Sequence, residues 1–417
     1  MLNYFYRFYL PLLELSPAKL LSIFFFLSFS SSAQVLPGAY QTTEYFQSLL
    51  ELSPTSNNVF PGAYQTTEYF PSLKGKNIAV VANQTSLINQ THLVDTLLSS
   101  MICVKKIFCP EHGFRGTADA GESIQSSKDG KTGLPAISLY GKNKKPYPSD
   151  LAEIDIIVFD IQDVGVRFYT YISTLHYVME ACAENNILLV ILDRPNPNAN
   201  YVDGPVLKPN YKSFVGMHTV PLVYGMTIGE YAQMINGEGW LSKKVKCNLQ
   251  VVKCKNYTHK TKYSLPIKPS PNLPNMQSVY LYPSLGLFEG TDVSVGRGTE
   301  YPFQILGNPF LDSTLFHFVP KSQPGAKNPM YEDKKCYGLD LRNSEDSVFT
   351  LKYLIKMYNL SPNKEAFFNP FFQKLMGSDE IIPMIKAGKT EEEIKNTWKV
   401  DLDKFKIIRK KYLLYED

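Results

Sequence analysis

The sequence predicts an α/β fold, in which a Rossmann-like parallel sheet domain is followed by a smaller α+β C-terminal domain. Between residues 72 and 205, short apolar runs typical of buried strands alternate with segments of helical periodicity. Such alternation favours a parallel sheet whose two faces are covered by helices. Beyond residue 205 the alternation ends, and helical patterns dominate again only near the C-terminus.

This pattern divides the 417-residue chain into four parts. We expect a signal peptide at residues 1–33 and a duplicated segment and linker at residues 34–71. We expect residues 72–220 to form a Rossmann-like catalytic domain. We expect residues 221–417 to form an α+β domain that completes the active-site cleft.

An apolar run at residues 20–29 follows Lys19 and continues into small residues that end at Ala33. This order is typical of a secretory signal peptide, and the run is too short to span a bilayer comfortably. We therefore expect cleavage near Ala33 and a periplasmic or secreted location. No later stretch of the sequence is apolar enough to predict a transmembrane segment.

Residues 37–46 recur unchanged as residues 61–70. Two short copies do not make a repeat architecture, which needs several stacked units. Only the second copy runs directly into the first core strand. Residues before about Val59 are therefore expected to be dispensable.

Four apolar runs in the first domain predict strands, at residues 77–82, 104–109, 154–159 and 187–192. Apolar side chains at helical spacing predict covering helices at residues 92–99 and 172–182. Each strand is followed at once by a polar cluster. Because ligands of open α/β sheets bind at the carboxyl ends of the strands, we expect these clusters to form one site.

The second domain is less regular. A capping box at residues 227–230 opens a predicted helix, and residues 249–254 predict a strand. Residues 268–309 lack periodicity, and an irregular loop of that length in a compact domain is usually functional. Residues 348–417 have a helical pattern, with another capping box that begins at Thr390.

Composition and motifs exclude several classes of protein. The 43 basic and 39 acidic side chains give a net charge of only +4, without a long basic run, so nucleic acid is not an expected partner. No glycine-rich nucleotide loop, H-E-x-x-H or zinc-ligand spacing occurs, so no cofactor or metal is expected. The strand ends carry carboxylates, amides, arginines and tyrosines, a set that suits a sugar substrate.

The most informative segment is residues 110–116, which places Glu111, His112 and Arg115 directly after a predicted strand. Glu111 is the predicted general acid, because a carboxyl group flanked by apolar neighbours has a pKa raised toward the useful range. The alternative is a structural pair of Glu111 with Arg115. His112 either orients Glu111, contacts the substrate, or is a hydrogen-bonded structural histidine.

A second catalytic carboxylate is expected from Asp163, after the third predicted strand, or from Glu289 in the second domain. Several arginines near one site suggest an anionic substrate, since a guanidinium pairs with a carboxylate through two hydrogen bonds. The predicted substrate-binding residues are Asn83, Arg115, Gln162, Arg167, Tyr169, Arg194, Asn196, Asn272 and Arg297.

Taken together, these segments resemble the NamZ-type exo-β-N-acetylmuramidases. The resemblance runs from about Val59 to near the C-terminus. It is carried by residues 83–85, 110–116, 132–135, 138–141, 159–171, 192–198, 224–227, 269–272, 289–291 and 296–299.

The resemblance implies a Rossmann-like domain plus a smaller C-terminal domain, with the site between them. It also implies release of N-acetylmuramic acid from the non-reducing ends of peptidoglycan fragments, with Glu111 as the catalytic residue. The lactyl carboxylate of that sugar would account for the arginines. Retaining, inverting and substrate-assisted mechanisms all remain open at this point.

Two alternatives belong to other functional classes. A non-catalytic muropeptide-binding protein would use the same arginines and amides. An acyl-transfer enzyme acting on peptidoglycan would need a nucleophilic serine with a base nearby, and Ser270 and Ser294 are its candidates.

Overall fold

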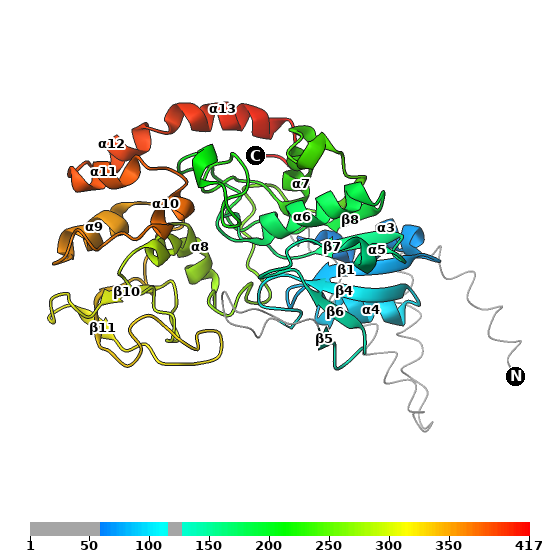
Figure 1. Ribbon diagram of the computed structural model, residues 1–417, viewed down its shortest axis with the longest axis horizontal. Coiled ribbons are helices and arrows are strands. Elements are labelled where there is room, and N and C mark those ends of the chain that lie inside the picture. The colour runs from blue at the N-terminus through cyan, green and yellow to red at the C-terminus, as the bar shows by residue number, and fades with distance from the viewer. Residues whose placement is uncertain (1–58, 116–126) are drawn as a thin grey trace, which may run out of the picture. The chain divides into compact units, whose positions relative to one another are not determined.

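Seven strands form the main sheet of the part of the chain that the computed structural model describes, residues 59–115 and 127–417 (Figure 1). The expected signal peptide and the first copy of the duplicated segment lie outside the described residues. The strands are β1 (Asn77–Ala82), β4 (Cys103–Cys109), β5 (Ser127–Lys128), β6 (Pro135–Ser138), β7 (Ile156–Asp160), β8 (Leu188–Leu192) and β9 (Leu249–Val252).

The order of these strands is that of the Rossmann fold. They lie in the order β5-β6-β4-β1-β7-β8-β9, and all neighbours are parallel except β5 and β6. Numbered along the chain, the parallel strands lie in the order 3-2-1-4-5-6. The order reverses between β1 and β7, and a crevice forms there beyond the carboxyl ends of the strands.

Different helices cover the two faces of the sheet. Successive side chains of a strand point to opposite faces. In β1, Ile78 and Val80 pack with α3 and α4, whereas Ala79 and Val81 pack with α6 and α7. The helices of this region are α3 (Thr66–Leu73), α4 (Leu93–Ser99), α5 (Pro148–Leu151), α6 (Tyr171–Glu184) and α7 (Ile228–Gly237).

The predicted strands and helices of this region are confirmed, with ends that differ by at most two residues. The sheet extends beyond residue 220, because β9 is its last strand and pairs with β8. Residues 59–71, assigned above to the duplicated segment, also pack on this region. Gly62 donates its backbone N–H to the carbonyl of Asp193 over 2.7 Å, and Phe60 pairs with Lys255.

The smaller C-terminal region combines an antiparallel sheet with helices, as expected for an α+β domain (Figure 1). Its sheet has the order β10-β12-β11, from β10 (Ile305–Asn308), β11 (Phe316–Phe318) and β12 (Cys336–Asp340). Its helices are α8 (Met276–Leu285), α9 (Lys352–Leu360), α10 (Phe371–Met376), α11 (Ile381–Lys386), α12 (Glu391–Asn396) and α13 (Lys399–Lys410). Both predicted capping boxes are present, at Thr227 and at Thr390.

Shorter elements connect these parts. They are η3 (Gly62–Tyr64), β2 (Leu87–Ile88), β3 (Thr91–His92), η4 (Pro209–Tyr211), η5 (Ser242–Lys244) and η6 (Gly286–Gly290).

The prediction that residues 268–309 form an irregular loop is wrong for α8. This helix is buried on several sides and contains Pro283, so it shows neither an apolar stripe nor a helical composition. Pro283 has no N–H for the carbonyl of Val279, four residues earlier. The side-chain amide of Asn198 donates to that carbonyl over 3.4 Å, which supplies the missing partner.

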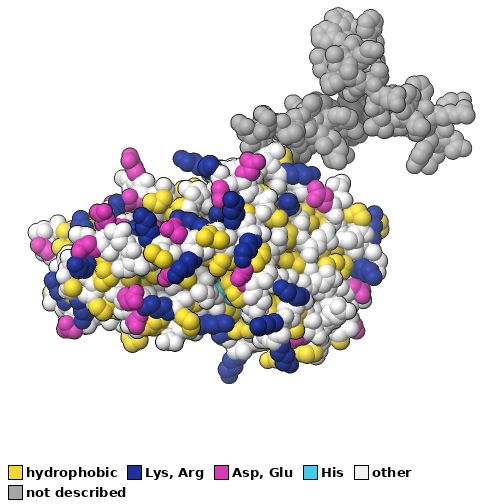
Figure 2. Space-filling view, turned by 90° about the horizontal axis from the view of Figure 1, so that it is seen from above, with side chains coloured by type: hydrophobic (Ala, Val, Ile, Leu, Met, Phe, Trp, Pro, Cys, Tyr) yellow, Lys and Arg dark blue, Asp and Glu magenta, His cyan; other side chains and the backbone are white. Residues whose placement is uncertain are grey.

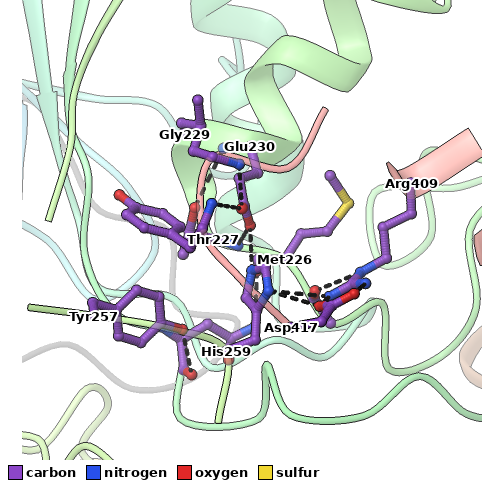
Figure 3. A network of polar contacts seen from close by, with 12 residues as sticks. Met226, Thr227, Gly229, Glu230, Tyr257, His259, Arg409 and Asp417 are labelled. Carbon is purple, nitrogen blue, oxygen red and sulfur yellow. Dashed lines mark hydrogen bonds and ion pairs between the residues drawn. The ribbon is translucent and has the colours of Figure 1, made fainter. Parts of the chain in front are cut away.

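The C-terminal residues are tied to the first region by a polar cluster in which His259, Glu230 and Arg409 are buried and Asp417 is exposed (Figure 3). His259 lies between two carboxylates, with Nε2 2.9 Å from Glu230 and Nδ1 2.8 Å from Asp417. Arg409 of α13 donates to both carboxylate oxygens of Asp417, over 2.7 and 2.8 Å, and to the carbonyl of Gly225. Helix α13 is thereby fixed against α7, which carries Glu230.

The surface seen in Figure 2 has scattered basic side chains, with acidic and apolar side chains between them. This agrees with the small net charge of +4. Among the described residues, no helix combines the length and the apolar character needed to cross a membrane.

Arg167, just before α6, joins the two regions. Its side chain is fully buried, and its Nη1 donates to the carbonyls of Pro205 and Val220 over 2.7 and 2.8 Å. Its Nη2 donates to Leu375 and Met376 of α10 over 3.1 and 2.7 Å. One guanidinium thus satisfies four backbone carbonyls from distant parts of the chain.

We predict that Arg167→Met destabilises the fold by about 3–5 kcal/mol, because it leaves several buried carbonyls without donors. Urea unfolding of both proteins measures this difference. Lys404→Met is the control, since Lys404 forms an exposed ion pair with Asp401 that contributes about 1 kcal/mol or less. An equal loss of unfolding free energy in the two variants would contradict the role of Arg167 in joining the two regions.

Candidate active site

A cavity of about 270 Å³ lies beyond the carboxyl ends of β4, β6 and β7, between the sheet and the C-terminal region. Both regions contribute side chains to its wall. Those of the first region are Glu111, His112, Tyr140, Phe168, Tyr169, Thr170, Tyr171, Phe214 and Val215. The remainder are Ser270, Leu273, Tyr282, Glu289, Arg297, Phe303, Phe371 and Leu375.

Glu111 is held in the wall by two hydroxyl groups. Thr170 donates its Oγ1–H to Glu111 Oε2 over 3.0 Å. The Tyr140 hydroxyl also bonds to the Glu111 side chain. Burial and the carboxylates of Glu111 and Glu289 raise the pKa of Tyr140, so this phenol stays protonated and remains a donor. The carboxyl group of Glu111 is therefore oriented from two sides, by residues that follow β6 and β7.

His112 adopts a left-handed backbone conformation with φ of 69°, and Gly113 follows with φ of 76°. This conformation costs a non-glycine residue roughly 1–2 kcal/mol. It turns the chain sharply after β4 and keeps the buried imidazole in the cavity wall. His112 Nε2 lies 3.4 Å from Ser270 Oγ, so the imidazole contacts the loop that leads to α8.

Glu289 and Arg297 form an ion pair in the wall contributed by the C-terminal region. Arg297 donates Nε–H and Nη2–H to Glu289 Oε1 over 3.0 and 2.8 Å. Burial alone would lower the pKa of Arg297, but the charge of Glu289 raises it, so the guanidinium stays charged. Arg297 Nη1 is buried and has no hydrogen-bond partner in the described part of the chain. Arg297 therefore has one N–H without an acceptor among these residues, on a side chain that lines the cavity.

The rest of the wall is mainly aromatic. Tyr169 packs edge-on against Tyr171, with ring centroids 4.7 Å apart, and against Tyr282 at 5.9 Å. The Tyr169 hydroxyl donates to the carbonyl of Pro269 over 2.9 Å, which fixes this ring. Aromatic walls with a few well-placed polar groups are typical of sites that bind small molecules.

Asp163, a candidate for the second carboxylate, is buried outside the lining of the cavity. Its Oδ2 accepts hydrogen bonds from Tyr224 and from the backbone N–H of Gly165, but its Oδ1 has no partner among the described residues. Burial raises the pKa of Asp163 from its ordinary value of 3.8 to about 6. Glu289, the other candidate, lies in the lining.

The predicted arginines are placed differently. Arg194 is buried and donates to both oxygens of Asp160 at the end of β7. Arg115 donates to both oxygens of Asp129, not to Glu111 as a structural pair would require. Arg167 is bound to backbone carbonyls, as described above. Of the four predicted arginines, Arg297 alone lines the cavity.

The predicted amides also lie outside the lining and bind backbone groups instead. Gln162 donates to the carbonyl of Pro195 over 2.7 Å, and Asn196 to that of Met226 over 2.8 Å. Asn272 donates to the carbonyl of Gly325 over 2.8 Å. Asn83 supports the wall, because its Nδ2 donates to the hydroxyl of Tyr171 over 3.0 Å.

The structure thus gathers Glu111, His112, Tyr169, Glu289 and Arg297 around the cavity. Sequence reasoning missed Tyr140 and Thr170, which hold Glu111. Tyr140 follows β6 and could have been found by the same rule of polar strand ends, but Phe214 follows no strand and carried no such signal. Ser294 lies outside the lining, whereas Ser270 belongs to it.

Comparison with known proteins gives close relatives over most of the chain. Residues 78–277 match the N-terminal model of the exo-β-N-acetylmuramidase NamZ family, and residues 280–415 match its C-terminal model. The peptidoglycan β-N-acetylmuramidase NamZ of Bacillus subtilis (strain 168) is 42% identical over 370 residues, which cover 82% of this chain and 88% of that protein.

Two solved structures of DUF1343 family proteins from Bacteroides fragilis NCTC 9343 share the fold. The first has a TM-score of 0.81 and 49% identity, and covers 86% of this chain and 99% of its own. The second has a TM-score of 0.75 and 30% identity, and covers 87% and 100%. With both family models matched in order and a 42% identical relative, the chain belongs to the NamZ family of exo-β-N-acetylmuramidases, which are glycoside hydrolases.

Proposed function

We propose that this protein is an exo-acting glycoside hydrolase that releases β-linked N-acetylmuramic acid from the non-reducing ends of peptidoglycan fragments. The observation that carries the proposal is the oriented Glu111 carboxyl group in the wall of a small aromatic cavity. Family membership and the peptidoglycan β-N-acetylmuramidase of Bacillus subtilis support the same substrate. The signal-like sequence at residues 1–33 supports a periplasmic or secreted location.

The size of the cavity supports exo action. Its volume of about 270 Å³ is below the roughly 300–1,000 Å³ of common ligand pockets. A single terminal sugar suits such a space, with its ring against the aromatic wall. The leaving part of the substrate then extends toward the opening.

Glu111 is assigned the general acid. Its proton passes to the glycosidic oxygen as the bond between that oxygen and the sugar C1 breaks. Thr170 and Tyr140 hold the carboxyl group in one orientation, which positions the proton for transfer. Water supplies the hydroxyl group that ends on C1.

Glu289 is assigned the second carboxylate, because it lines the cavity and Asp163 does not. It either activates water, attacks C1 itself, or stabilises the positive charge while the acetamido group of the substrate attacks. The stereochemistry of the released sugar separates inversion from the other two routes.

Arg297 is assigned to the lactyl carboxylate of the terminal sugar. Its buried Nη1 lacks a hydrogen-bond acceptor among the described residues, and its charge is retained beside Glu289. A carboxylate of the substrate accepts a hydrogen bond from this N–H and is attracted by the positive charge of the guanidinium.

The acyl-transfer alternative has one observation in its favour, the contact between Ser270 and His112 in the cavity wall. Their 3.4 Å separation is longer than the roughly 2.6–3.2 Å of an activated nucleophile and its base. Under the proposed function, Ser270→Ala keeps most of the glycosidase activity.

We predict that Glu111→Gln lowers kcat for release of N-acetylmuramic acid by about 10²-fold or more, because the general acid is lost. The substrate is a disaccharide with this sugar at its non-reducing end, and the released sugar is quantified. Substrate binding should survive, since the shape of the side chain is kept. The exposed Glu153→Gln is the control. Full activity of Glu111→Gln, or tight binding without turnover by the wild type, would contradict the proposal.

We predict that Arg297→Met lowers kcat/KM for a terminal N-acetylmuramic acid by about 10–100-fold, because a charge-assisted hydrogen bond to the carboxylate is lost. The same glycoside without the lactyl group should be affected less. Arg297→Lys should recover part of the loss, since the charge remains. A loss of equal size on both substrates would indicate that Arg297 only holds Glu289 in place.

We predict that Asp163→Asn keeps activity within about tenfold but removes a pH dependence of stability. Asp163 has a pKa of about 6 when folded and an ordinary value of 3.8, so the folded state binds its proton more tightly. Its contribution is therefore fully present below about pH 4 and is lost as pH rises through about 6. The loss is on the order of 3 kcal/mol.

Free energies of unfolding measured from about pH 4 to 7.5 check this prediction. As pH rises, the free energy of unfolding of the wild type should fall relative to that of the variant, because asparagine does not titrate. The asparagine side chain still provides an acceptor for Tyr224 and Gly165. A constant difference over this range would contradict it. A fall in activity of about 10²-fold or more would instead make Asp163 the second catalytic carboxylate.

A further inference from the structure

A lysine lies over an aromatic ring at one side of the cavity. Lys144 Nζ is 4.6 Å from the centroid of the Phe214 ring, and Phe214 belongs to the cavity lining. The ring of Tyr140, also in the lining, is 6.0 Å from that of Phe214. These three side chains, Tyr140, Lys144 and Phe214, form what we call the Phe214 rim.

The Phe214 rim is supported from behind by α6. The ring of Tyr177 stacks on Phe214 at 6.4 Å with an interplanar angle of 20°. Ser173 donates its Oγ–H to the carbonyl of Phe214 over 2.7 Å. The ring therefore occupies a fixed position before any ligand arrives, which lowers the entropic cost of binding.

The rim carries an uncompensated positive charge. Lys144 is partly exposed and has no carboxylate within 4 Å in the described part of the chain. The next residue, Lys145, is different, because it pairs with Glu180 and Glu184 at 2.9 and 2.6 Å. Lys144 is therefore available to an anionic group of a ligand.

The rim lies on the side of the cavity occupied by the general acid. Tyr140 bonds to the side chain of Glu111, and it is also part of the rim. A general acid faces the oxygen that leaves with the aglycone. The Glu289–Arg297 pair comes instead from the C-terminal region. A residue that contacts Glu111, as Tyr140 does, therefore lies close to the oxygen that joins the terminal sugar to the aglycone.

We propose that the Phe214 rim binds the aglycone, with the edge of Phe214 as an apolar contact for its first sugar and Lys144 as the partner of a carboxylate that the aglycone carries. This inference rests on the proposed function. If it holds, the enzyme prefers fragments with an anionic aglycone to fragments with a neutral aglycone. The carboxylate comes either from the lactyl group of the next N-acetylmuramic acid or from a peptide stem attached there.

The test compares Lys144→Met with the wild type on two substrates with the same terminal sugar. One is the tetrasaccharide of alternating N-acetylmuramic acid and N-acetylglucosamine, whose aglycone is anionic. The other is the 4-nitrophenyl glycoside, whose aglycone is neutral. We expect kcat/KM of the variant to fall by about three- to tenfold on the tetrasaccharide, mainly through KM, and by less than about twofold on the glycoside.

Two matched variants sharpen the comparison. Lys144→Arg should keep the preference for the tetrasaccharide, since it keeps the charge over the ring. Lys142→Met removes an exposed lysine of the same loop and should leave the preference unchanged. Added salt should reduce the wild-type preference toward that of Lys144→Met.

A tetrasaccharide with a peptide stem on its inner N-acetylmuramic acid identifies the source of the carboxylate. An effect of Lys144→Met on the plain tetrasaccharide alone assigns the lactyl group, and an effect on the stem-bearing substrate alone assigns the stem. Equal losses on the neutral and anionic aglycones, or an equal effect of Lys142→Met, would overturn the inference and leave the proposed function intact. No release by the wild type from any substrate would overturn both.

Discussion

The buried guanidinium of Arg167 holds the two regions at the spacing that the cavity requires. It binds carbonyls of Pro205 and Val220 on one side and of α10 on the other. Phe371 and Leu375 of α10 belong to the lining, so a shift of this helix would open the cavity. A charge in this position is costly to bury, and the four carbonyls offset that cost only while both regions are docked. The shape of the cavity and the folding of the chain are thereby coupled through one side chain.

The strand ends show what could be predicted from the sequence. A parallel sheet brings the residues after its strands to one edge, and this rule found Glu111, His112 and Tyr169. It could not separate them from Asp163 or Asn196, which follow strands equally closely. Those residues satisfy backbone groups of the connections themselves, a use that depends on three-dimensional partners.

Residues of the C-terminal region were harder to predict, because α8 and the loops around it have no regular period. Glu289 and Arg297 were found from their charge next to glycines, not from a predicted element. Phe214 was missed because an aromatic residue in an irregular segment is indistinguishable, in sequence, from one that packs in the core. Only the fold shows that its ring stacks on Tyr177 and lines the cavity.

The first turn of the sheet explains why Rossmann topology serves sugar chemistry here. In nucleotide-binding relatives of this topology, a glycine-rich turn after the first strand leaves room for a pyrophosphate. Here Asn83 accepts the backbone N–H of Thr85 over 2.9 Å, and its own carbonyl contacts His92 Nε2 at 2.9 Å. The turn is filled by its own side chains and braces Tyr171. The crevice is therefore lined by residues that follow β4, β6 and β7. In place of a phosphate site, it contains the carboxyl group of Glu111 and several aromatic rings.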